Sequence, residues 1–131
     1  MKEMTIPATV ENIEKVTDFV NGQLEEIDCP IKAQMQIDIA IDELFGNIAH
    51  YAYNPETGPA TVRVAPISVI VTFIDHGVPY DPLKKDDPDI TLSAEERDIG
   101  GLGIFMVKKT MDEIAYEYKD GQNILRIRKD I

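Results

Sequence analysis

Apolar residues in the first half of the chain recur at the spacing of two amphipathic helices. A first helix is predicted between an N-cap at Thr9 and a break at Asp28-Cys29-Pro30, and a second from Ile31 to about Tyr53. The positions that would face a core are Ile13, Val16, Val20, Leu24 and Ile27 in the first helix, and Ile37, Ile41, Leu44, Phe45, Ile48 and Ala52 in the second. Each helix is therefore expected to bury one side.

Short runs rich in β-branched residues predict strands at residues 4–8, 61–64, 69–74, 114–118 and 124–128. Pro7 either ends the first strand or places it at a sheet edge, because proline cannot donate to a strand ladder. The run 69–74 is apolar at nearly every position, which predicts a central strand. Asp120-Gly121 between the last two runs favours a two-residue hairpin turn.

The segment from about Asp81 to Asp98 is polar and is interrupted by prolines, which predicts a mobile loop. Ser93 followed by Glu96 is a capping-box pattern, so one helical turn is expected inside this loop. A third helix is predicted from about Leu102 to Met111. This order of elements predicts an α+β fold with helices layered on one face of a mixed, mostly antiparallel sheet.

Composition narrows the class of protein. A chain of 131 residues with 44% hydrophobic and 28% charged residues is typical of one globular domain, here residues 1–131. The formal net charge of -11 argues against nucleic acid as a partner. A phosphate ligand would therefore have to be held by backbone N–H groups, a helix N-terminus and a divalent cation.

Targeting signals and cysteine chemistry are not indicated. Cys29 is the only cysteine, which excludes an intrachain disulfide and a thiolate cluster. The first residues lack the order of a signal peptide and no apolar run is long enough to span a membrane, so the expected location is the cytoplasm.

The second predicted helix carries a polar stripe opposite its apolar one. Glu43, Asn47 and His50 lie at i, i+4 and i+7, so they share one side of the helix. A carboxylate one turn from a carboxamide offers a proton acceptor beside an oxygen ligand for Mg²⁺. The stripe alone is more typical of a solvated helix face, although Gly46 within the helix hints at close approach by another group.

The central strand ends in Asp75-His76-Gly77. A carboxylate at this point can accept a hydrogen bond from an exocyclic amine, and Gly77 would let the backbone approach a flat ring. An ordinary Asp-x-Gly turn is the alternative, and the three residues alone favour it.

Gly100-Gly101-Leu102-Gly103 directly precedes the third predicted helix. Unhindered N–H groups and the positive end of a helix dipole could there face an anion. The pattern is neither a Walker loop nor a dinucleotide fingerprint. A flexible lid hinge is an equally good interpretation and is compatible with anion binding.

Taken in order, these three patterns resemble the N, G1 and G2 boxes of the GHKL (Bergerat) ATPase superfamily. The surrounding residues 40–53, 75–82 and 101–107 are similar to the stand-alone anti-sigma factor serine kinases, and the resemblance covers nearly the whole chain. It implies a two-layer α/β sandwich that binds ATP with Mg²⁺.

The resemblance also implies roles for the first two boxes. Glu43 would be the general base and Asn47 a Mg²⁺ ligand. Asp75 would read the adenine amine, and Gly77 would allow the base to approach. His50 would lie near the nucleotide, although a packing histidine is favoured over a catalytic one.

For the third box, the resemblance implies that Gly100, Gly101 and Gly103, with Leu102 between them, wrap the phosphates. Arg97 would meet the γ-phosphate when the lid closes. Two features depart from the family: the link between Val64 and Val69 is short, and Arg126 stands near a position where these proteins often have a threonine.

The function implied is a kinase that phosphorylates a serine on a small STAS-type anti-anti-sigma protein and otherwise holds a sigma factor inactive, as a homodimer. An ATP-binding switch without phosphotransfer, or a slow ATPase, is the alternative. A histidine kinase is disfavoured, because His50 and His76 are the only histidines and both lie within the boxes.

Overall fold

The computed structural model describes residues 2–53, 55–65, 69–84 and 99–131. The strands are β1 (Lys2–Pro7), β2 (Pro59–Ala65), β3 (Ile70–Asp75), β4 (Glu113–Lys119) and β5 (Gln122–Arg128). The helices are α1 (Ile13–Glu26), α2 (Ile31–Tyr51) and α3 (Ile99–Thr110), with short 3₁₀ turns η1 (Val10–Asn12) and η2 (Pro82–Lys84).

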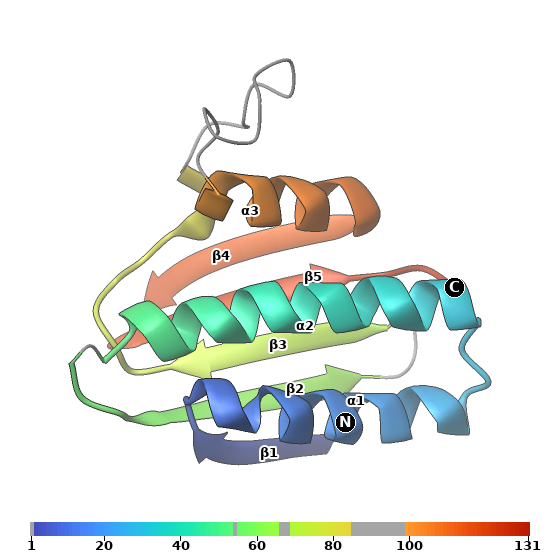
Figure 1. Ribbon diagram of the computed structural model, residues 1–131, viewed down its shortest axis with the longest axis horizontal. Coiled ribbons are helices and arrows are strands. Elements are labelled where there is room, and N and C mark those ends of the chain that lie inside the picture. Colours follow the sequence, from blue (N-terminus) through green and yellow to red (C-terminus); the bar gives the residue numbers. More distant parts are fainter. Residues whose placement is uncertain (1, 54, 66–68, 85–98) are drawn as a thin grey trace.

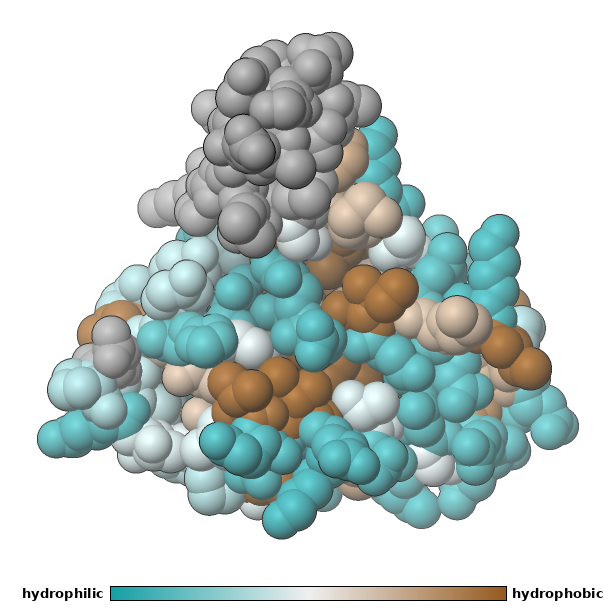
Figure 2. Space-filling model, in the orientation of Figure 1, coloured by the Kyte–Doolittle hydropathy of each residue, from teal (hydrophilic) through white to brown (hydrophobic). Residues whose placement is uncertain are grey.

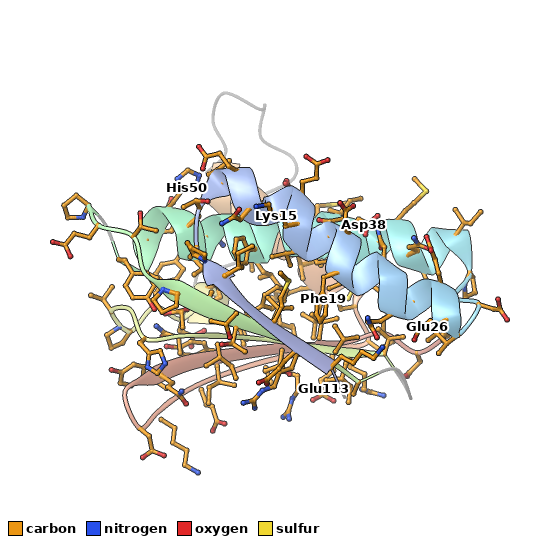
Figure 3. The ribbon with its side chains drawn as sticks, turned by 90° about the horizontal axis from the view of Figure 1, so that it is seen from below. Lys15, Phe19, Glu26, Asp38, His50 and Glu113 are labelled. Atoms are coloured by element: carbon orange, nitrogen blue, oxygen red, sulfur yellow. The ribbon has the colours of Figure 1, made fainter. Side chains whose placement is uncertain are left out.

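The strands form one five-stranded sheet in the order β1-β2-β3-β5-β4, and every neighbouring pair is antiparallel. The three helices lie together on one side of this sheet (Figures 1 and 3). The α+β prediction is therefore confirmed, β3 is central as expected, and β1 is an edge strand that ends at Pro7. No described helix combines the length and the apolar character needed to cross a bilayer.

The apolar stripes predicted for the first two helices form the core. Val16, Val20 and Leu24 of α1 are fully buried, and so are Ile37 and Ile41 of α2. Thr9 is a correction: it precedes the 3₁₀ turn η1 and its side chain makes no capping hydrogen bond. Asn12 fixes the chain at the start of the first helix instead, because its side chain donates a hydrogen bond to the Pro7 carbonyl at 2.8 Å.

Side chains alternate between the two faces of the sheet along each strand. One face is covered by the helices, and no described helix covers the other (Figure 3). Phe73 and Leu125, which are opposite each other across β3 and β5, are buried against the helices. Thr72 and Arg126 form the next pair and point to the other face, where Figure 3 shows side chains but no described helix. The β4–β5 hairpin turns through Asp120 and Gly121 with φ angles of 54° and 76°, as a two-residue hairpin requires.

The third helix begins earlier than predicted. It starts at Ile99, so the glycines lie in its first turns instead of before it. The first four N–H groups of a helix have no partner inside the helix, so the N–H groups of the first glycines are not used by the helix itself. Ile104, Val107 and Met111 anchor the rest of the helix in the core. Arg97 and the helical turn expected at 93–96 lie outside the described residues.

Candidate functional site

Asp75 is the last residue of β3 and is only 3% exposed, with its side chain on the helix side of the sheet. Its Oδ1 accepts hydrogen bonds from the Gly77 N–H and from Asn123 Nδ2, each at 2.9 Å. The Asp-x-Gly turn is thus formed, as the alternative interpretation expected. Within the described part of the chain Oδ2 has no hydrogen bond, so this oxygen remains available to a ligand.

A pocket opens beside this carboxylate, between the second half of α2 and the strands β3 and β5. Its wall is largely apolar and includes Leu44, Ile48 and Phe73, while Asn47 and Asp75 supply polar atoms. An apolar slot with one buried acceptor suits a flat ring that carries an amine. The structure therefore brings residues of the first two sequence patterns to one cavity.

Asn123 links several segments of the pocket wall by hydrogen bonds, and the sequence analysis did not predict it. This buried side chain donates to Asp75 Oδ1 and to the Val78 carbonyl, both at 2.9 Å, and accepts from the Tyr80 N–H at 3.1 Å and from the Tyr116 hydroxyl. The sequence signal that could have found it is the alternation of buried and exposed positions along β5. Asn123 is a polar residue at a position that this alternation assigns to the buried side.

The departure noted at Arg126 has a structural answer. Arg126 points to the open face of the sheet, opposite Thr72, and does not approach the pocket. The position that pairs with Asp75 on β5 belongs to Asn123. Asn123, and not Arg126, is therefore the polar residue of this part of β5 that lines the pocket.

Tyr51, Tyr80 and Tyr116 line the pocket, and Tyr53 forms hydrogen bonds with the backbone nearby. Tyr51 and Tyr80 stack with ring centroids 5.4 Å apart, and both line the cavity. Burial raises the pKa of Tyr116, so its hydroxyl stays protonated and can donate to Asn123. Burial also raises the pKa of Tyr53, whose hydroxyl donates to the Pro59 carbonyl at 2.6 Å and accepts from the His76 N–H at 2.8 Å.

Glu43 and Asn47 are half-buried, in contrast to the solvated helix face that the stripe alone favoured. Asn47 Nδ2 donates to Glu43 Oε1 at 3.4 Å. A Cβ added to Gly103 would lie 2.2 Å from the carboxyl carbon of Glu43, so α3 rests directly against this carboxylate. His50, in contrast, is exposed at the end of α2, and the expectation of a packing histidine is wrong.

Gly77 is required by packing. A Cβ at this position would lie 2.2 Å from the Ala52 carbonyl oxygen, and the Val78 N–H donates to the same oxygen at 3.0 Å. The space left by the glycine is therefore filled by the end of α2. Its predicted role in admitting a ring stays a prediction.

The glycine segment lies at the N-terminus of α3. Gly100, Gly101 and Leu102 belong to its first turn, where backbone N–H groups lack intrahelical partners and the helix dipole is positive. This end of α3 lies beside Glu43 through Gly103. The geometry thus joins the three sequence patterns around one site, with Arg97 outside the described residues.

The comparisons with known proteins agree with this geometry. The sequence pattern of the histidine kinase-like ATPase domain matches residues 6–129. The chain belongs to this family. Membership accounts for the sheet order and the helix layer, and it implies that the domain binds ATP.

Relatives of this histidine kinase-like ATPase domain include several bacterial kinases. The chain is 26% identical to the serine/threonine-protein kinase BtrW of Bordetella bronchiseptica over 99 residues, which cover 73% of this chain and 70% of the relative. It is 26% identical to the serine-protein kinase RsbW of Bacillus cereus over 129 residues, which cover 94% of this chain and 81% of the relative. RsbW of Bacillus mycoides is 25% identical over the same shares.

Proposed function

We propose that this protein is a serine-protein kinase that transfers the γ-phosphate of ATP to a serine of a small STAS-type anti-anti-sigma protein. The observation that carries the proposal is the Glu43–Asn47 pair, held beside the pocket at Asp75 and directly against Gly103 of α3. The names of the relatives support protein serine as the acceptor. In its other state the protein would bind a sigma factor as an anti-sigma factor, as a homodimer in the cytoplasm.

Nucleotide recognition follows from the pocket. Asp75 Oδ2 would accept a hydrogen bond from the adenine amine, while Oδ1 is held by Gly77 and Asn123. Guanine presents a carbonyl oxygen at the corresponding place, which a carboxylate repels. The N–H groups of Gly100, Gly101 and Leu102 would face the phosphates, and a closed lid would add Arg97 at the γ-phosphate.

The donor set at the phosphate end fits Mg²⁺. Asn47 turns its Nδ2 toward Glu43, which leaves its carbonyl oxygen as a hard neutral ligand. A bound Mg²⁺ would offset charge on the phosphates. Asn47 therefore serves both the ion and the orientation of Glu43.

The chemical step assigned to Glu43 is proton acceptance. The serine oxygen attacks the γ-phosphorus, the bond from that phosphorus to the β–γ bridging oxygen breaks, and the serine proton passes to the Glu43 carboxylate. ADP carries away the bridging oxygen. The hydrogen bond from Asn47 keeps the carboxylate in place, so catalysis rests on positioning and electrostatics.

The fate of the γ-phosphate tests this proposal. The chain would be incubated with ATP labelled with radioactive phosphorus at the γ position and with a purified STAS-type protein from the same genome. Label on the partner's serine, lost in Glu43→Gln and in a partner whose serine is alanine, is the expected result. Label released only as inorganic phosphate would make the protein a slow ATPase, and no release would make it an ATP-dependent switch.

A further inference from the structure

Three large apolar side chains stand in a row on the solvent side of α2. Ile31, Met35 and Ile39 are 75%, 59% and 57% exposed, and their four-residue spacing aligns them as one ridge. We call them the α2 ridge. Figure 2 shows brown and tan atoms in a row along α2, between teal neighbours. Ile37 and Ile41 already supply the buried side of the helix, so the ridge is surplus to the core.

The α2 ridge points along the helix to the proposed catalytic carboxylate. Ile39 precedes Glu43 by one turn, about 6 Å along the axis, and Ile31 precedes it by about 18 Å. Asp42 lies between Ile39 and Glu43, is exposed, and has no ion pair in the described part of the chain. The surface that runs from the α2 ridge to Glu43 is therefore apolar along the ridge and acidic beside Glu43.

The size of the ridge favours a transient partner. Side chains of this size expose roughly 200 Å² when fully accessible, so the three present about 380 Å² together, against about 800 Å² per partner in a stable interface. A permanent dimer needs more surface than this. A substrate protein that must leave after each transfer does not.

We propose that the α2 ridge is the docking surface for the protein substrate of the kinase. This inference rests on the proposed function and adds the chemistry of the partner. The partner presents its serine beside an apolar patch that extends between about 6 and 18 Å from the serine, matching the positions of the ridge along α2. A lysine or arginine near that serine would pair with Asp42.

Kinetics of phosphotransfer test the docking surface. Ile39→Glu and Met35→Glu place a charge on the ridge without touching the pocket, and Ile131→Glu, at 53% exposure, is the matched control. The assay uses γ-labelled ATP and the purified STAS-type protein. We expect the KM for the protein substrate to rise at least about tenfold in both ridge variants, with kcat within about twofold, because docking and chemistry use different residues. The control should keep the wild-type KM.

Two further readouts separate this proposal from the proposed function. Stabilisation by Mg-ATP in thermal unfolding should be the same in the ridge variants and the wild type, since the nucleotide pocket is unchanged. An unchanged KM in both variants would overturn the docking surface, and a changed oligomeric state in sedimentation would not rescue it. The kinase assignment would still stand. Failure of the wild type to label any protein serine would instead overturn the proposed function, and the docking proposal with it.

Discussion

Asn123→Ala is the substitution whose effect follows most directly from the structure. The variant removes the hydrogen bonds donated to Asp75 and Val78, a longer one to the Gly77 carbonyl at 3.4 Å, and two accepted ones, from Tyr80 and Tyr116. Each bond contributes about 1 kcal/mol net, and the bond to a carboxylate somewhat more, so the free energy of unfolding should fall by about 3–4 kcal/mol. This is a large share of the 5–15 kcal/mol typical of a domain.

Chemical denaturation measures that loss, and titration calorimetry measures its effect on the site. The affinity for ATP should fall at least about tenfold at a temperature where the variant is folded, because Asp75 is no longer held at the pocket. Gln122→Ala is the matched control. Gln122 is the neighbour of Asn123 in the sequence, and its side chain has no hydrogen bond in the described part of the structure. The free energy of unfolding of this variant should change by no more than about 0.5 kcal/mol. A loss below about 1 kcal/mol for Asn123→Ala, or an unchanged ATP affinity, would refute the reasoning.

Three further substitutions have distinct expected outcomes. Gly103→Ala pushes the Glu43 carboxylate aside, so the rate of phosphotransfer should fall at least about a hundredfold in the radiolabel assay. The free energy of unfolding, measured by denaturation, should change by no more than about 1 kcal/mol, because alanine favours the helix. Gly77→Ala meets the backbone of Ala52 and should lower the free energy of unfolding by about 3 kcal/mol, which a shift of the denaturation midpoint reports. Asp38→Asn should stabilise the protein by about 1 kcal/mol at neutral pH, because burial raises the pKa of this carboxyl and its Oδ1 has no hydrogen-bond partner in the described part. A folded-state pKa above the unfolded value makes the ionised carboxyl costly, so the gain should vanish as the pH falls below about 4; a gain that is constant with pH contradicts this explanation.

Much of the fold was predictable because local patterns and tertiary structure agree. The stripe through Val16 and Val20 predicted α1, and the apolar run around Phe73 predicted the central strand. Asp120-Gly121 predicted the hairpin turn. In each case one short segment carries the whole signal.

The features that sequence reasoning missed depend on contacts between distant segments. Asn123 reaches Asp75 only because β5 pairs with β3, 48 residues away, and no local pattern reveals that pairing. The backbone that fills the space at Gly77 comes from Ala52 at the end of another element. His50 shows a further limit, because helical spacing gives the side of a helix but not what covers that side.

Thermal unfolding with and without saturating Mg-ATP tests the central claim most directly, in the wild type, Asp75→Asn and Glu43→Ala. At about a hundred times its dissociation constant, a ligand adds about 2.7 kcal/mol, which raises the midpoint by about 10 °C for a domain of this size. The account predicts this rise in the wild type and in Glu43→Ala, whose lost carboxylate serves chemistry, and its loss in Asp75→Asn. An equal rise in Asp75→Asn, or none in the wild type, would contradict the assignment of the pocket.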